Sequence, residues 1–292
     1  MAAGMLFKTM RWIPADAHKS INIWVLYVAL PAASLRYIPD IKWSGQMLLP
    51  VASSVIVWMG SWFFMEAYCR YKGYSQRSRS SLELASGYSN TSFVGFPLVV
   101  AYLGEQSMSI AVICDQSMFI LFSIAGVIAA VKGGGAKEGT VSTAMVLRRL
   151  VTFPPFIACM LALVLSPVVD LSPTAPFFEK LALTVSPLAL FSVGLQLKFK
   201  GWRQQIPQIS MALFYKLLVA PALVLGVVLA IGMKGAIPAV SVLEASMPAL
   251  VTSGIVAEQY HLNTRLVNLI IGVSIVVGLL TTAFWNGALH WL

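Results

Sequence analysis

The chain has 292 residues, of which 58% are hydrophobic and 11% are charged, and its formal net charge is +9 at pH 7. Soluble proteins carry about 25% charged residues, so this composition excludes an ordinary soluble domain. Apolar segments recur as far as the C-terminus, whereas a secretory signal is one short apolar stretch before a polar chain. The sequence therefore predicts an all-α polytopic membrane protein.

Nine charge-poor runs predict membrane-spanning helices. In chain order, these runs cover residues 21–38, 45–68, 82–104, 107–131, 151–169, 174–197, 206–232, 237–258 and 264–290. The first residues of the chain are apolar as well, but Lys8 and Arg11 follow them at once. They can form only part of a span, so the first helix is expected to be shortened.

Two of these spans, 82–104 and 237–258, are interrupted near their middles. The interruptions consist of Ser89, Asn90, Thr91 and Ser92 in the first span and of Ser246, Met247 and Pro248 in the second. A break there leaves backbone NH and C=O groups without helical partners, and lipid cannot satisfy them, so protein or a water-filled cavity must cover them. Many secondary transporters build their substrate site from two such broken helices.

An internal repeat relates the two halves of the chain. A shift of 156 residues, which is the separation of Pro31 and Pro187, also carries Ser92 onto Pro248 and superposes the two interruptions. Agreement of helices, prolines and breaks under one ungapped shift is stronger evidence for a repeat than any single identical residue. We therefore predict two five-helix repeats. Because each repeat has an odd number of helices, the two halves are expected to be inverted relative to each other.

The basic residues are distributed unevenly over the loops. If successive loops alternate sides, fifteen of the twenty Lys and Arg residues fall on one side and three on the other. The positive-inside rule places the first side in the cytoplasm. Arg77 and Lys137 are thus predicted to face the cytoplasm, and Lys234 and the C-terminal Leu292 to face outside, in the cell (inner) membrane. These short basic loops also account for the net charge without nucleic-acid binding.

Three segments of the chain carry distinctive motifs. They are residues 90–98, Asn-Thr-Ser-Phe-Val-Gly-Phe-Pro-Leu; residues 247–250, Met-Pro-Ala-Leu, followed by 256–260, Val-Ala-Glu-Gln-Tyr; and residues 27–32. In that order, they resemble the fourth-helix motif, the ninth-helix region and the second helix of the auxin efflux carrier family, which includes plant PIN carriers and bacterial malonate-type transporters. Plant carriers have a proline just before the Asn-Thr pair, whereas this chain has Ser89.

The resemblance implies ten helices, with helices four and nine crossing at unwound centres, and a transport domain that moves against a scaffold in an elevator-like way. On that basis, residues 1–43 and 146–203 are expected to form the scaffold domain. Residues 44–131 and 204–292 are expected to form the transport (crossover) domain, with 132–145 as a cytoplasmic linker.

The residues at the two breaks favour an anion at the crossing. Ser89 and Asn90 are good N-cap residues, and Pro248 suits the first turn of a helix. Two half-helices that start there would direct free NH groups and positive dipole ends at the crossing, and the Asn90 amide can also donate to a carboxylate. The predicted substrate site consists of Ser89, Asn90, Thr91, Ser92, Met247, Pro248, Ala249 and Leu250. The alternative is that Pro248 and Gly95 are ordinary helix kinks.

Two acidic residues lie inside predicted spans, where burial is costly and usually functional. Asp115 and Glu244 are candidates for carrying a coupling proton or for binding a coupling cation such as sodium. The alternative pairs Asp115 with Ser117 or Asn268 and gives Glu244 a water-filled edge. Lys216 is expected to be paired internally or to snorkel.

Together these features predict a secondary active transporter of small organic anions, such as mono- or dicarboxylates, that works by alternating access without a cofactor. The sequence has neither a metal-binding HExxH motif nor the Gly-Lys-Ser/Thr ending of a phosphate loop, so neither an enzyme nor an ATP-driven pump is expected. One alternative is a cation-coupled symporter of the bile-acid type, which an acid-rich crossing would favour over the neutral crossing that this sequence predicts. Another is a membrane receptor without transport. The expected partners are the anion, the lipid bilayer and a coupling proton or sodium ion, and a homodimer through the scaffold domain stays open.

Overall fold

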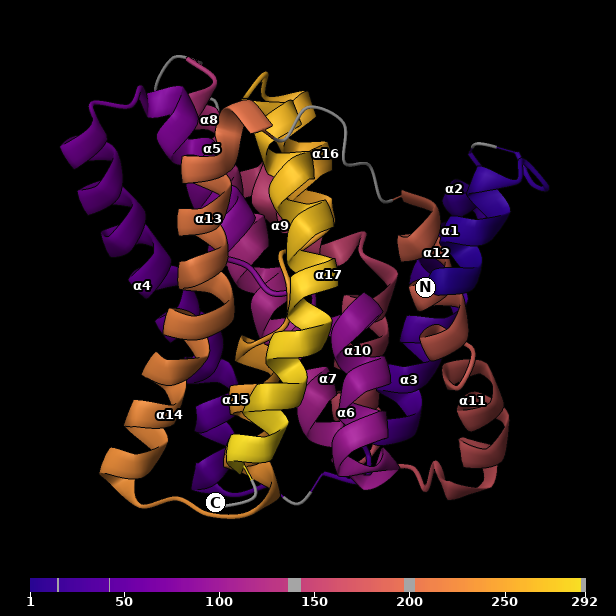
Figure 1. Cartoon of the computed structure of the whole chain (residues 1–292). Coiled ribbons are helices and arrows are strands. Elements are labelled where there is room, and N and C mark those ends of the chain that lie inside the picture. The colour runs from indigo at the N-terminus through magenta and orange to yellow at the C-terminus, as the bar shows by residue number, and fades with distance from the viewer. Residues whose placement is uncertain (15, 42, 136–142, 197–202, 290–292) are drawn as a thin grey trace.

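The computed structural model describes residues 1–14, 16–41, 43–135, 143–196 and 203–289. Over these ranges the chain is almost entirely helical (Figure 1). The described residues form no strand, and their one β-type pairing is an isolated antiparallel bridge between Ser89 and Ala249. The predicted all-α class is confirmed.

The α-helices carry the labels of Figure 1. In chain order they are α1 (Ala2–Thr9), α2 (Ala17–Trp24), α3 (Leu30–Tyr37), α4 (Leu48–Lys72), α5 (Gln76–Ser86), α6 (Phe96–Leu103), α7 (Met108–Leu121), α8 (Val127–Gly133), α9 (Thr143–Val151), α10 (Pro154–Leu165), α11 (Ala175–Ala182), α12 (Val185–Gln196), α13 (Ile206–Phe214), α14 (Ala220–Ile231), α15 (Ala236–Ala245), α16 (Thr252–Gln259) and α17 (Thr264–Leu289). Within the described chain, four π-helical turns join some of them: η1 (Val25–Ala29), η3 (Thr91–Gly95), η5 (Phe122–Gly126) and η8 (Tyr215–Val219).

Five helical segments of the described chain are long and apolar enough to cross a membrane without a break. They are Gly45–Lys72, Glu105–Gly133, Ser172–Gln196, Ile206–Ile231 and Thr264–Leu289, and each matches a predicted span. The predicted span 151–169 is a sixth, if α9 and α10, which meet at 73°, are taken together. The spans 82–104 and 237–258 consist of shorter helices on either side of their breaks, and the span 21–38 is helical through α2, η1 and α3.

Three of the π-helical turns stand directly before a proline. The turns η1, η3 and η8 end two residues before Pro31, Pro97 and Pro221. A helical proline has no NH for the carbonyl four residues earlier, and its ring crowds that carbonyl; the wider π turn separates the two groups. At Pro221 the carbonyl left free is that of Leu217, and the Trp285 indole donates to it at 2.8 Å. The indole NH from another helix thus replaces the backbone NH that Pro221 lacks. Such a replacement is needed because lipid cannot donate a hydrogen bond to the carbonyl.

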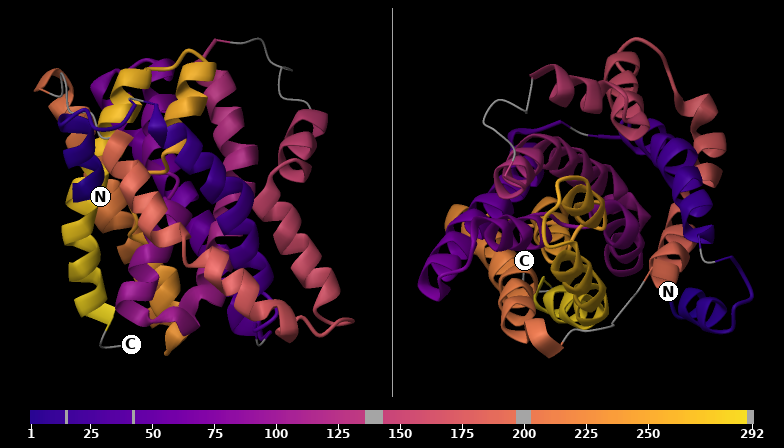
Figure 2. Two further views of the ribbon diagram at one scale, coloured as in Figure 1. Left: turned by 90° about the vertical axis from the view of Figure 1, so that its right-hand side faces the viewer. Right: turned by 90° about the horizontal axis from the view of Figure 1, so that it is seen from above.

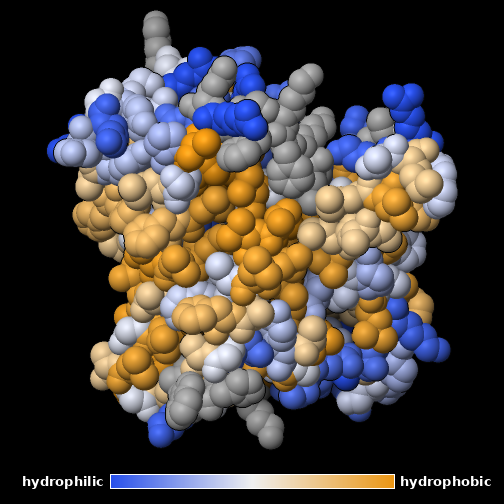
Figure 3. All heavy atoms as spheres, in the orientation of Figure 1, coloured by the Kyte–Doolittle hydropathy of each residue, from blue (hydrophilic) through white to orange (hydrophobic). Residues whose placement is uncertain are grey.

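The surface is divided into bands. Figure 3 shows an apolar belt across the middle of one face of the molecule, with hydrophilic residues gathered toward both ends. Large apolar side chains such as Leu229, Leu280 and Phe284 are exposed on the outer faces of α14 and α17. A soluble protein rarely exposes so much apolar surface, and the belt identifies a multi-pass integral membrane protein.

The N-terminal helix packs against a helix far away in the chain. Helix α1 packs on α12, and α10 packs on α3, so the N-terminal segment lies beside residues from the second half (Figure 2). The contact is close, because a Cβ atom on Gly194 would lie 3.0 Å from the backbone carbonyl carbon of Met1. The shift of 156 residues carries α1 into α10 and α3 into α12, so these two contacts are equivalent under the predicted repeat. The inverted repeat itself stays a prediction.

The predicted orientation can be tested at two exposed positions. Arg77 lies near the start of α5, and Lys234 lies in the connection between α14 and α15 at the opposite end of the molecule (Figure 1). The other two positions of this prediction, Lys137 and Leu292, lie outside the described residues. We expect an impermeant thiol reagent to modify Lys234→Cys, but not Arg77→Cys, in intact cells. The three native cysteines are buried, so the background should be low. The reverse labelling pattern would overturn the orientation.

Candidate functional site

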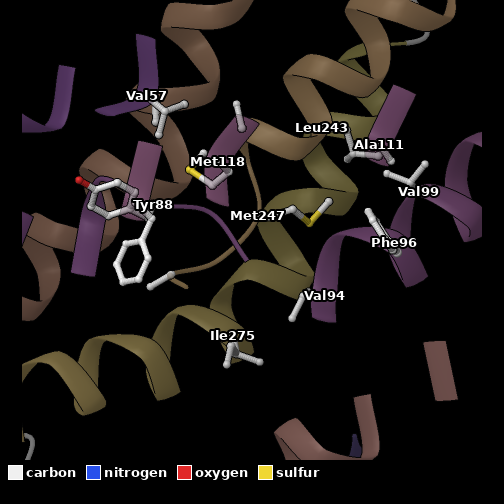
Figure 4. Close-up of a cluster of buried hydrophobic side chains, with 14 of the residues drawn as sticks. Val57, Tyr88, Val94, Phe96, Val99, Ala111, Met118, Leu243, Met247 and Ile275 are labelled. Carbon is white, nitrogen blue, oxygen red and sulfur yellow. The ribbon is translucent and has the colours of Figure 1, made fainter. Parts of the chain in front are cut away.

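The two interruptions lie against each other at the centre of the molecule. The Asn90 NH donates to the Pro248 carbonyl at 2.8 Å, and the Leu250 NH donates to the Tyr88 carbonyl at 3.1 Å. Each unwound segment thus satisfies backbone groups of the other, which lipid could not do. Both are therefore unwound segments and not simple kinks. Figure 4 shows the buried apolar side chains near them, including Tyr88, Val94 and Met247.

Asn90 is the N-cap of the half-helix that follows the first break. Its Oδ1 accepts from the Phe93 NH at 3.2 Å, so the predicted cap is confirmed. Its Nδ2 is buried and has no hydrogen-bond partner among the described residues. The amide therefore presents a free donor at the crossing, which is unusual because buried polar atoms are normally paired.

Two further predictions about the breaks are wrong. Pro248 does not begin a helix, because α16 starts at Thr252 and Pro248 lies in the unwound segment, where its carbonyl accepts from Asn90. Ser89 is not a cap either, since its hydroxyl accepts from the Lys216 ammonium at 2.8 Å. Proline and serine are compatible with both roles, and the packing of neighbouring helices decides between them.

A cavity of about 380 Å³ lies beside the crossing. Its polar lining includes Asn22, Asn90, Thr91, Asp115, Arg149 and Gln196, and its apolar lining includes several aromatic rings. The helical turns that follow both breaks border it through residues 90–93 and 250–252. The positive ends of η3 and α16 therefore face the cavity, which favours a negative group there.

Only four of the eight predicted substrate-binding residues line the cavity. Asn90, Thr91, Ser92 and Leu250 line it. The other four predicted residues, Ser89, Met247, Pro248 and Ala249, are buried and do not line it. Three of them join the two breaks instead: Ser89 and Ala249 form the antiparallel bridge, and the Pro248 carbonyl accepts from the Asn90 NH.

Arg149 of α9 is a cavity residue that sequence reasoning missed. Its guanidinium carbon lies 5.5 Å from the centre of the Phe122 ring, a cation–π contact that holds the side chain at the cavity wall. Among the described residues it forms no ion pair with an acidic side chain. In the sequence, Arg148 and Arg149 counted only as loop charges that set orientation, and nothing in their spacing distinguishes one from the other.

Asp115 of α7 lines the same cavity and is joined to the first break. The Thr91 hydroxyl donates to Asp115 Oδ1 at 2.5 Å, and the Gln116 amide is 3.5 Å from Oδ2. Asp115 is thus paired with polar groups, as the alternative interpretation has it, but these are Thr91 and Gln116, and the Ser117 hydroxyl donates to the Ile113 carbonyl instead. The candidate coupling residue is therefore in direct contact with a predicted substrate residue.

The crossing is charged, so the expected neutral crossing is wrong. Lys216 is fully buried, and its ammonium donates to the Ser89 hydroxyl and to the Ala245 carbonyl, both at 2.8 Å. It is paired internally, as expected, and it does not snorkel. Glu244 is buried at 1% exposure, which disagrees with the alternative of a water-filled edge, and neither carboxylate oxygen has a hydrogen-bond partner among the described residues.

A second cavity of about 690 Å³ adjoins the first. The two share Gln196, Val251 and Ile255 in their linings. The second is also lined by Lys8, Arg11 and His18 from the N-terminal segment, which the charge distribution assigns to the cytoplasmic side. A chain of adjoining cavities therefore leads from the basic end of the molecule to the crossing.

Comparison with known proteins gives one family and several relatives. The profile of the family described as "Membrane transport protein" matches residues 1–286. A protein of Methanothermobacter thermautotrophicus named "Uncharacterized transporter" is 24% identical over 288 residues, which is 97% of this chain and 93% of the relative. A Methanocaldococcus jannaschii transporter is 25% identical over 292 residues, with coverage of 97% and 93%. A Rhizobium meliloti protein named "Putative malonate transporter" is 24% identical over 286 residues, with coverage of 91% and 87%.

Proposed function

Because the chain belongs to the membrane transport protein family, the family of the auxin efflux carriers, it is a membrane transporter and not an enzyme, and we propose that its substrates are small organic anions such as mono- or dicarboxylates. The supporting observation is the cavity beside the crossing, where the free amide of Asn90, the guanidinium of Arg149 and two helix N-termini converge. All of these groups attract a carboxylate. The name of the Rhizobium relative, a malonate transporter, agrees with this substrate class.

We place the substrate against Asn90, Thr91, Ser92 and Leu250, with Arg149 on the opposite wall as counter-charge. Transport is secondary active, and Asp115 is the foremost candidate for coupling because it borders the cavity and accepts a hydrogen bond from Thr91. Glu244 is the second candidate, because its carboxylate is buried without a hydrogen-bond partner among the described residues.

The proposed movement is of the elevator type. The cavity lies between segments of the proposed scaffold domain, which supply Asn22, Tyr27 and Phe153, and the crossing, which belongs to the proposed transport domain. A site at that boundary would change its exposure when one domain slides along the other. We propose the cytoplasmic side as the open side in this state, with the chain in the inner membrane and the C-terminus outside.

A cation-coupled symporter of the bile-acid type is the second candidate. The observation in its favour is the pair of buried acids near the crossing, Asp115 and Glu244. Such a symporter needs a sodium gradient for uptake, whereas a proton-coupled anion carrier needs only a pH gradient.

Uptake into proteoliposomes tests the proposed function. We expect the purified chain to take up at least one radiolabelled carboxylate from a panel that includes malonate and a monocarboxylate, and a pH gradient to stimulate this uptake. Protein-free liposomes are the control. Uptake that depends on sodium and not on pH would favour the symporter. Uptake of no carboxylate above the control would contradict the proposal.

A further inference from the structure

Lys216 is held in place by an irregular stretch of helix. It lies in the π-helical turn η8, between α13 and α14. The turn is tied on two sides: the Tyr215 hydroxyl donates to the Val57 carbonyl at 2.5 Å, and the Trp285 indole donates to the Leu217 carbonyl at 2.8 Å. π-Helical turns inside helices often occur at functional sites, and this one directs a lysine side chain into the protein.

The ammonium of Lys216 joins the two broken helices. It donates to the hydroxyl of Ser89, in the first break, and to the carbonyl of Ala245, the last residue of α15 before the second break. The last carbonyls of a helix have no helical partner and form the negative end of its dipole. A positive charge is favoured at that place, and the bilayer offers no water to hydrogen-bond these carbonyls.

A counter-charge stands beside these two acceptors. Glu244 directly precedes Ala245, whose carbonyl accepts from the Lys216 ammonium, and its carboxylate is buried without a hydrogen-bond partner among the described residues. The carboxylate packs against the first half-helix, since a Cβ atom on Gly95 would lie 2.8 Å from Glu244 Oε1. A buried carboxylate without hydrogen bonds is very unfavourable unless a positive charge is near.

We propose that the two broken helices form a site for a small monovalent cation and that the ammonium of Lys216 permanently occupies it. The oxygen atoms of Ser89 and Ala245 are its ligands, and Glu244 is its counter-charge. Unwound carbonyls and the C-terminal ends of half-helices bind sodium in other transporters, and here a lysine replaces the free ion. The protein therefore needs no free cation at this place, and a variant that lacks the lysine should acquire a site for one.

Thermal unfolding of the purified protein in detergent tests the proposal without any transport assay, so its outcome is independent of the proposed function. Lys216→Ala should lower the unfolding temperature by about 10 °C in choline chloride, because it leaves a buried charge uncompensated. Ammonium or sodium chloride at the same ionic strength should restore most of that loss, since these ions fit the space that choline cannot enter. The wild type and Lys180→Ala, which removes an exposed lysine, should unfold at the same temperature in all three salts.

Two results would overturn the proposal: an unfolding temperature of Lys216→Ala that is the same in the three salts, or a wild type that sodium stabilises as much as the variant. If Lys216→Ala does not fold, Lys216→Met and the double variant Lys216→Met/Glu244→Gln replace it. The double variant should unfold at a higher temperature than Lys216→Met, because both charges are removed together. A double variant that is no more stable than the single one would contradict the assignment of Glu244 as counter-charge.

Discussion

Replacing Asn90 with alanine should weaken carboxylate binding about tenfold or more while the protein still folds. The side chain has two roles in the structure: its Oδ1 caps the half-helix at Phe93, and its Nδ2 is a buried donor without a partner among the described residues. Loss of the cap costs about 1 kcal/mol. Removing a donor that is unsatisfied in the empty protein offsets part of that cost, because such a group carries a desolvation penalty of about 1–3 kcal/mol.

Asn90→Ala destabilises the carboxylate-bound protein more than the empty protein. A hydrogen bond from the amide to a carboxylate is worth roughly 1.5–3 kcal/mol, and each 1.4 kcal/mol is about a factor of ten in affinity. Asn90→Asp should be worse than Asn90→Ala, because a negative charge would then face the substrate in a poorly solvated site. The measurement is binding of the best-transported carboxylate to purified protein.

Asn263→Ala is the matched control. Asn263 Oδ1 accepts from the Leu266 NH at 3.2 Å at the start of α17, so it also caps a helix, but it lines neither cavity. Its replacement should remove a cap and leave affinity unchanged. Unchanged affinity in Asn90→Ala, or stronger carboxylate binding in Asn90→Asp, would place the substrate elsewhere and favour a cation at the crossing.

The sequence predicts the two breaks because their residues are unlike those of the apolar runs around them. Four consecutive small polar residues at 89–92, and a proline at 248, interrupt runs that are otherwise apolar enough to span a bilayer. Only mutual pairing or a polar cavity can accommodate such segments, and it is the resemblance to the auxin efflux carriers that implies their crossing. The cap at Asn90 follows from the same local reasoning, since capping depends on residues three positions apart.

The partners of these segments could not be predicted, because they come from distant helices. The lysine that reaches Ser89 is 127 residues away in the chain, and the aspartate that accepts from Thr91 is 24 residues away. Both contacts depend on how helices rotate about their axes. The π-helical turns change that rotation by a fraction of a turn, and a proline pattern alone does not fix where it changes. The sequence therefore predicts a neutral crossing, although three ionisable side chains lie in or beside it.

Replacing Arg149 with glutamine should reduce the affinity for a carboxylate about tenfold to a hundredfold. The guanidinium is the one basic group in the lining of the smaller cavity, as far as the described residues show, and it forms no ion pair with an acidic side chain there. A hydrogen bond to a charged group is worth roughly 1.5–3 kcal/mol, which gives that range. The remaining binding should also depend less on salt, since one charge pair that salt screens has been lost.

Arg149→Lys and Arg148→Gln show whether the effect comes from charge in the cavity. Lysine keeps the positive charge but loses the planar group that lies over the Phe122 ring, so its affinity should fall between those of the wild type and Arg149→Gln. Arg148 is the neighbouring residue of α9, is exposed and does not line the cavity; its replacement should leave affinity unchanged. If Arg149→Gln bound the carboxylate as tightly as the wild type, Arg149 would not contribute to binding. If Arg148→Gln weakened binding equally, Arg149 would act only through the general surface charge. The anion would then be held by Asn90 and the helix N-termini alone.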